Sequence, residues 1–104
     1  MFLILGHDEC PYCDKAKALL DKRGLSYAGV NLKQVYQDWR QAFTDLQPCI
    51  KGQRSVPLIF YNKQATPPET LSIEGLKGWE FIGGYNDLEK YLFVKMGYEL
   101  DDDY

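Results

Sequence analysis

The sequence lacks long apolar runs and any excess of positive charge. Its apolar opening, residues 2–5, ends at Gly6, whereas a secretory signal needs roughly 7 to 15 apolar residues and a membrane-spanning helix about 20. The 104 residues carry 12 basic and 15 acidic side chains, a formal net charge of −3, which gives no electrostatic support for nucleic-acid binding. We therefore expect a cytoplasmic protein that binds neither membranes nor nucleic acid.

The cysteines are too few, and odd in number, for a structural disulfide framework. Only Cys10, Cys13 and Cys49 occur, whereas small secreted domains normally pair an even set. With 45% hydrophobic residues, residues 1–104 are expected to form one domain that buries a core without crosslinks or metals. The odd count favours a reducing compartment, and Cys49 is expected to be a semi-buried apolar residue.

Apolar periodicity predicts an α/β fold. A continuous apolar run at residues 2–5 indicates a strand buried on both faces, and a helical stripe follows over residues 12–20. Residues 26–32 are the next strand candidate, and a second amphipathic helix is expected over residues 35–46, closed by Pro48. The order strand-helix-strand-helix favours a parallel pair joined by a right-handed crossover.

The second half predicts two antiparallel strands and a final helix. Residues 56–61 and 79–82 are the strand candidates, and Pro57 is tolerated only at a strand start or edge. Asn86 or Asp87 can cap the helix that follows. The predicted order is therefore β-α-β-α-β-β-α, a mixed four-stranded sheet flanked by three helices.

Two segments fall outside this core. Residues 62–78 are a long connection between the last two strands, either a tolerated surface elaboration or an element that recognises partners. Within it, Thr-Pro-Pro-Glu at residues 66–69 has the form of a capping box and predicts a short helix. The acidic ending at residues 101–104 is expected to be a solvated tail.

The segment Cys10-Pro11-Tyr12-Cys13 carries the most chemical information. It lies between a predicted strand and a predicted helix, and a helix N-terminus stabilises a thiolate and lowers its pKa. A thiolate attacks disulfides, and a second cysteine two residues on can resolve the mixed disulfide that results. We expect Cys10 to be the more exposed and more acidic thiol and Cys13 the buried resolver.

Two other chemistries use the same residues. His7, Cys10, Cys13 and Cys49 supply four potential zinc ligands, although nothing near Cys49 provides a second ligand pair at the usual spacing. A cysteine–histidine hydrolase requires His7 to approach Cys10 across a turn with an orienting partner. Both interpretations stay open on the sequence alone.

Three separated signatures occur in one order along the chain. They are Cys10-Pro11-Tyr12-Cys13, then Arg54-Ser55-Val56-Pro57, then Gly83-Gly84-Tyr85-Asn86-Asp87. In this combination the chain resembles a dithiol glutaredoxin of the thioredoxin fold over most of its length, with serine where the family's Thr-Val-Pro segment has threonine. The compact chain is also similar to glutaredoxins encoded by phages.

The resemblance implies a glutathione-dependent thiol-disulfide oxidoreductase, with Cys10 as nucleophile, Cys13 as resolving thiol and no metal or prosthetic group. It implies that Pro57 is cis and that glutathione, as co-substrate, is held by Tyr12, Arg54, Val56, Pro57, Gly84, Asn86 and Asp87. The Val56 backbone would pair with the cysteinyl part, and the start of the last helix would hold the γ-glutamyl end. The implied partners of this monomer are disulfide-containing proteins, ribonucleotide reductase among them.

Two alternatives accompany the resemblance. One is a binding module in which two chains share a 2Fe-2S cluster through Cys10 and glutathione, an arrangement that proline at position 11 generally disfavours in the family. The other is a glutaredoxin-like protein reduced by thioredoxin reductase, against which the glutathione signatures argue.

The sequence departs from many relatives at His7, where they carry lysine or arginine to help hold glutathione and lower the thiol pKa. The next residues are Asp8 and Glu9, whose charges oppose thiolate formation at Cys10, although exposed charges are screened within about 8 Å at physiological ionic strength. Arg54 and Gln53 are candidates to compensate.

We therefore predict that the pKa of Cys10 is higher, and glutathione binding weaker, than in relatives with lysine at position 7. The physical cause is the loss of one positive charge and the presence of two carboxylates beside the thiol. A thiol titration measures this directly, and a strongly acidic Cys10 would contradict the prediction.

Overall fold

Four short strands form one mixed sheet in the order β2-β1-β3-β4. The computed structural model describes residues 1–64 and 66–98. The strands are β1 (Phe2–Gly6), β2 (Tyr27–Asn31), β3 (Leu58–Tyr61) and β4 (Glu80–Gly83). β1 pairs parallel with β2 and antiparallel with β3, and β3 pairs antiparallel with β4. The predicted mixed sheet, with its parallel pair in the first half and its antiparallel pair in the second, is confirmed.

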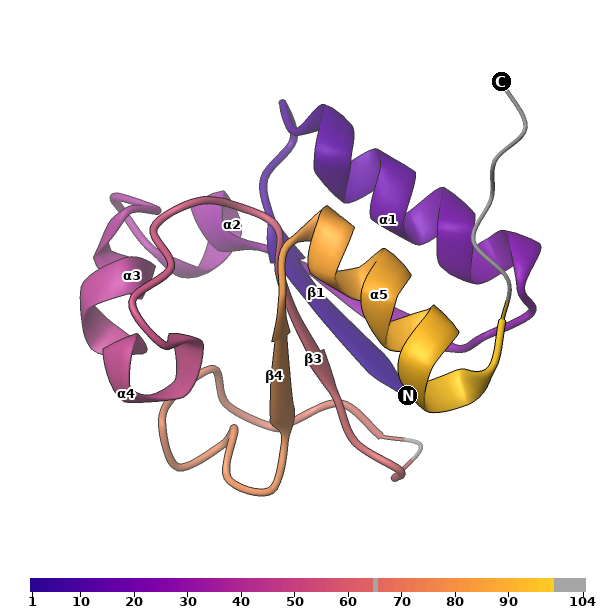
Figure 1. Cartoon of the computed structure of the whole chain (residues 1–104). Helices are drawn as coiled ribbons and strands as arrows, with labels where there is room; N and C mark the ends of the chain where they lie inside the picture. Colours follow the sequence, from indigo (N-terminus) through magenta and orange to yellow (C-terminus); the bar gives the residue numbers. More distant parts are fainter. Residues whose placement is uncertain (65, 99–104) are drawn as a thin grey trace.

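Helices cover both faces of this sheet (Figure 1). α1 (Pro11–Lys22) and α5 (Tyr85–Met96) lie side by side on one face. The short helices α2 (Leu32–Val35), α3 (Gln41–Asp45) and α4 (Gln47–Ile50) lie on the other. The sheet is therefore the middle of three layers, and each face needs its own apolar residues. Within residues 1–64 and 66–98, no helix is long and apolar enough to cross a membrane.

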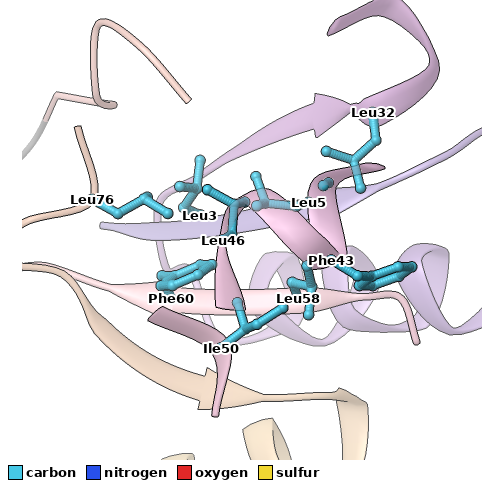
Figure 2. Close-up of a cluster of buried hydrophobic side chains, with 10 residues drawn as sticks. Leu3, Leu5, Leu32, Phe43, Leu46, Ile50, Leu58, Phe60 and Leu76 are labelled. Carbon is cyan, nitrogen blue, oxygen red and sulfur yellow. The ribbon is translucent and has the colours of Figure 1, made fainter. Parts of the chain in front are cut away.

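β1 supplies apolar residues to both faces because successive side chains of a strand point to opposite sides. Leu3 and Leu5 join the cluster beneath α2, α3 and α4 (Figure 2), whereas Phe2 and Ile4 join the cluster beneath α1 and α5. All of β1 is buried, which explains why its sequence shows a continuous apolar run. β1 ends at Gly6, and three residues separate it from the first residue of the cysteine motif.

The predicted helix over residues 35–46 is replaced by three shorter helices. Tyr36 leaves α2 in an extended conformation, with φ −118° and ψ 145°. A turn follows in which Asp38 accepts hydrogen bonds from the Arg40 amide, at 3.1 Å, and the Gln41 amide, at 2.9 Å. Pro48 does not close a helix but lies in the first turn of α4, where its missing amide proton has no partner to lose.

The connection over residues 62–78 also differs from expectation, because residues 66–69 form no helix. Turns occupy residues 73–78. The Leu76 amide there donates a hydrogen bond to the Ser72 carbonyl oxygen at 2.9 Å. The Leu76 side chain is 2% exposed and reaches the core cluster beneath α2, α3 and α4 (Figure 2). The connection is therefore partly structural rather than a surface elaboration alone. The acidic ending, residues 101–104, lies outside the described residues.

Candidate active site

Cys10 and Cys13 form a disulfide at the N-terminus of α1. Cys10 is the N-cap residue, with an extended backbone, and Pro11 occupies the first helical turn. The Cys13 amide donates to Cys10 Sγ at 3.1 Å and to the Cys10 carbonyl oxygen at 3.1 Å. The helix thus aims an amide dipole at the first sulfur, which stabilises a thiolate there after reduction.

The two sulfurs of the disulfide differ in their surroundings. Cys10 is 6% exposed and Cys13 is 2% exposed, so the order is as expected although both are buried in the oxidised state. Cys13 packs against β1, where a Cβ atom added at Gly6 would overlap Cys13 Sγ. Glycine at this position is therefore required to let α1 approach the sheet with its second cysteine inward.

A groove of about 420 Å³ opens beside the motif. All of the predicted glutathione-binding residues except Arg54 line it, and they come from three segments far apart in the sequence. The lining comprises Tyr12, Gln53, Ser55, Val56, Pro57, Gly84, Tyr85, Asn86 and Asp87. The fold thus brings the three sequence signatures together around one concave surface.

The loop before β3 is fixed by Gln53, a residue that the motif comparison did not place in the site. Gln53 Nε2 donates to the Ser55 carbonyl oxygen at 2.9 Å and to the Pro57 carbonyl oxygen at 3.0 Å. These two carbonyls flank Val56, and the peptide bond between Val56 and Pro57 is cis, as the resemblance implies. A side-chain amide offers two donors, so one residue holds both sides of the Val56 backbone.

The N-terminus of α5 forms the opposite wall of the groove. Gly84, rather than Asn86 or Asp87, is the N-cap residue. Asp87, at the third helical position, accepts a hydrogen bond on Oδ2 from the Gly84 amide at 3.0 Å. Asp87 therefore contributes to the cap from inside the first turn, by accepting from the amide of the N-cap residue. Asn86 is exposed and lines the groove.

Positive charge near the groove comes from a residue that sequence reasoning missed. Arg54 is exposed and does not belong to the groove lining. Lys15 Nζ instead lies 4.9 Å from the centre of the Tyr12 ring, which is itself 54% exposed and 6.1 Å from the Tyr85 ring. Helical spacing of three residues places Lys15 over Tyr12, a relation that the periodicity alone could have shown.

The two acidic residues before Cys10 have partners in β2 and α2. Asp8 Oδ1 accepts from Asn31 Nδ2 at 2.5 Å, and Glu9 Oε1 accepts from Lys33 Nζ at 3.2 Å. These contacts are exposed, so each contributes little to stability. They nevertheless direct both carboxylates toward the β2 side of the molecule and away from the groove.

The residues proposed for zinc or hydrolase chemistry do not converge on one site in the described part of the chain. The His7 ring packs against Trp39, with 4.6 Å between ring centres. Cys49 lies in α4 and packs against the cluster on the sheet face opposite α1. Within residues 1–64 and 66–98, no group of three or more histidine, cysteine, aspartate or glutamate side chains is placed to hold a metal ion.

Comparison with known proteins agrees with the geometry. The sequence profile of the glutaredoxin family matches residues 2–65. Glutaredoxin 1 of Rickettsia typhi is 41% identical over 51 residues, which are 49% of this chain and 46% of that protein. The Probable glutaredoxin of Acanthamoeba polyphaga mimivirus is 30% identical over 94 residues, 90% of this chain and 79% of that protein. The alignment thus spans less than half of the rickettsial relative but most of the viral one.

Solved structures show the same fold. A buckwheat glutaredoxin in complex with glutathione superposes with a TM-score of 0.60 at 25% identity, over 92% of this chain and 70% of that one. A wheat glutaredoxin gives a TM-score of 0.62 at 22% identity, over 90% of this chain and 73% of that one. The family profile and the viral relative, together with the Cys10-Pro11-Tyr12-Cys13 disulfide at a helix N-terminus, show that the chain belongs to the glutaredoxin family.

Proposed function

We propose that the protein is a glutathione-dependent thiol-disulfide oxidoreductase that reduces glutathione mixed disulfides and protein disulfides. The observation that carries the proposal is the adjacency of the Cys10–Cys13 disulfide to the groove in which the other two family signatures meet. Tyr12 belongs to both, because it lies between the cysteines and lines the groove.

The reaction begins with the reduced pair. The Cys10 thiolate attacks a substrate disulfide, the bond between the two substrate sulfurs breaks, and one substrate thiolate leaves. On a protein substrate the Cys13 thiolate then attacks Cys10 Sγ, closes the disulfide and releases the second thiolate. Two molecules of glutathione then restore the dithiol. The first attacks Cys10 Sγ, forms a mixed disulfide there and releases the Cys13 thiolate. The second attacks the glutathione sulfur of that mixed disulfide and releases the Cys10 thiolate and glutathione disulfide.

The groove offers complementary groups for glutathione. The exposed segment around Val56 can pair with the peptide backbone of the ligand as an added strand. The first residues of α5, Tyr85, Asn86 and Asp87, line the groove, and the free amides of a helix N-terminus can bind a carboxylate. The Asp87 carboxylate is suited to the ammonium of the γ-glutamyl end, and Lys15 adds positive charge beside Tyr12. The buckwheat relative, solved with glutathione, supports the same ligand here.

The expected protein partners are disulfide-containing proteins that present an extended segment to the same groove. Ribonucleotide reductase is one partner of this class. A reducing compartment such as the cytoplasm fits a cysteine pair that must cycle between dithiol and disulfide. The groove and the motif lie within one chain, so this function is proposed for the monomer.

Replacing Asp87 by asparagine is expected to raise the KM for glutathione about tenfold, which corresponds to about 1.4 kcal/mol. Asparagine keeps an oxygen that can accept from the Gly84 amide but loses the charge that pairs with the ammonium. Steady-state turnover of a glutathione mixed disulfide measures the change. Glu89→Gln, the same charge change on the same helix outside the groove lining, is the matched control, and an equal KM in both variants would contradict the assignment.

The reductant separates the proposed function from its alternatives. The wild-type protein is assayed with glutathione and glutathione reductase, and separately with thioredoxin reductase. Turnover only with glutathione and glutathione reductase supports the proposal. Turnover only with thioredoxin reductase would contradict it and favour a glutaredoxin-like protein reduced by that enzyme. Anaerobic reconstitution with iron and sulfide, followed by an absorption spectrum, tests for a shared 2Fe-2S cluster.

A further inference from the structure

A second cleft, of about 270 Å³, lies on the other side of α1 from the glutathione groove and shares no lining residue with it. It lies between α1, the ends of β1 and β2 and the start of α2. Cys13 and Lys17 line it from the helix, and Asn31 and Gln34 line it from β2 and α2. The resolving cysteine, 2% exposed, therefore borders a polar opening of its own.

Two glycines on the α1 face of the sheet make room for this cleft. Gly6 ends β1 beneath Cys13 Sγ. Gly29 lies on β2 and pairs with Ile4, which is two residues before Gly6 and so on the same face of the sheet. A Cβ atom at Gly29 would lie 3.2 Å from Lys17 Cε and 3.4 Å from Lys17 Nζ. The Lys17 side chain thus lies across the bare backbone of β2, with its ammonium directed into the cleft rather than away from the protein.

Cys13 and Lys17 stand four residues apart on α1 and so occupy the same helical face. The other charged or titratable groups that line the cleft are His7 and Asp8, from the loop after β1, and Asp14, from α1; β2 and α2 contribute only uncharged side chains. Asp8 is already held by Asn31. Within residues 1–64 and 66–98, Lys17 Nζ forms no salt bridge with any of these carboxylates, so none of them neutralises its charge directly.

We propose that Lys17 is a positioning residue for the step in which Cys13 attacks the mixed disulfide. Its ammonium, held over Gly29 in the second cleft, stabilises the Cys13 thiolate. This inference rests on the proposed function, because it assumes that Cys13 is the resolving thiol. A thiolate buried next to Gly6 and Ile4 would otherwise be destabilised by loss of water. The cleft supplies both a cation and a path to solvent on the side away from the substrate.

The step balances without a further reagent. The Cys13 thiol loses its proton to solvent through the cleft, and the charge of Lys17 stabilises the thiolate that remains. That thiolate attacks Cys10 Sγ in the mixed disulfide, the Cys10–Cys13 bond forms, and the electron pair of the broken bond leaves on the substrate thiolate. Proton exit and product release thus take place on opposite sides of α1.

The test measures the ionisation of Cys13 in full-length protein that carries Cys10→Ser and Cys49→Ser, so that one thiol remains. Lys17→Met, which keeps the aliphatic stem over Gly29 and removes the charge, is expected to raise the Cys13 pKa by about one unit, and so to lower the thiolate fraction about tenfold at neutral pH. Lys17→Arg should restore the parent value. Lys95→Met, an exposed lysine in the last turn of α5, controls for the change in net charge.

A second measurement uses protein with both motif cysteines and only Cys49→Ser. Lys17→Met should slow closure of the disulfide from the glutathione mixed disulfide about tenfold at neutral pH and shift its pH profile upward by the same amount. Lys17→Gln serves if the methionine variant does not fold. Equal Cys13 titrations in the Lys17 and Lys95 variants would overturn the proposal. The titration needs no glutathione, so it stands apart from a failure of glutathione-dependent turnover.

Discussion

Cys10→Ser is expected to remove all reduction of both glutathione mixed disulfides and protein disulfides. A serine hydroxyl does not ionise at neutral pH and cannot form the mixed disulfide, whereas the thiolate is the attacking species. Cys10 is also the sulfur that receives the amide hydrogen bond at the helix N-terminus. This substitution therefore has the largest effect on activity that the structure predicts.

Cys13→Ser separates the two substrate classes. The Cys10 mixed disulfide with glutathione can be reduced by a second glutathione, so turnover of small mixed disulfides should survive. Reduction of a protein disulfide needs the intramolecular attack by Cys13 and should fall to background. Cys49→Ser should leave both rates unchanged, because Cys49 lies in α4 on the opposite face of the sheet. Turnover without Cys10 would refute the assigned nucleophile.

Local sequence patterns were sufficient to predict those features of the fold that depend only on residues close together in the chain. The Cys10-Pro11-Tyr12-Cys13 motif predicted a helix N-terminus because capping, proline at the first turn and the macrodipole all act within one turn. The buried strand at residues 2–5 was equally readable, because a strand covered on both faces is apolar at every position. These two features fix the position of Cys10, the proposed nucleophile.

The segment at residues 35–46 shows why periodicity alone was insufficient. Ala42, Phe43 and Leu46 are buried as a helix would bury them, yet Val35 is 51% exposed. The turn at Asp38 breaks the helix while keeping the later apolar side chains on the core. An apolar pattern records which residues face inward, and several backbone paths can satisfy it.

The groove shows a different limit. Arg54 and Gln53 are adjacent in sequence, and the charge of arginine made it the expected ligand contact. The side-chain amide of Gln53 is the one that turns inward, where it donates to the carbonyl oxygens of Ser55 and Pro57. Which of two neighbours faces the site depends on the loop conformation, which only the assembled sheet and α5 define.

Gly83→Ala is expected to be the most destabilising single-atom change near the groove, with a loss of about 3 kcal/mol in the free energy of unfolding. Gly83 has φ +126°, a backbone conformation that L residues rarely adopt. Its added Cβ would also overlap the Asp87 carboxylate, which must then leave the Gly84 amide. The first turn of α5 would lose the hydrogen bond between the Gly84 amide and Asp87, and the Asp87 carboxylate would no longer hold its place in the groove.

Gly97→Ala separates the two causes. Gly97 ends α5 with φ +76°, but nothing lies within 4 Å of an added Cβ atom. Only the backbone cost remains, about 1 kcal/mol, and Asp87 is untouched. Urea unfolding should therefore rank Gly83→Ala well below Gly97→Ala in stability, and only Gly83→Ala should raise the KM for glutathione. Equal losses of stability in the two variants would mean that the Gly83–Asp87 contact yields without cost. The glycine pair of the third signature would then owe its place to backbone conformation alone.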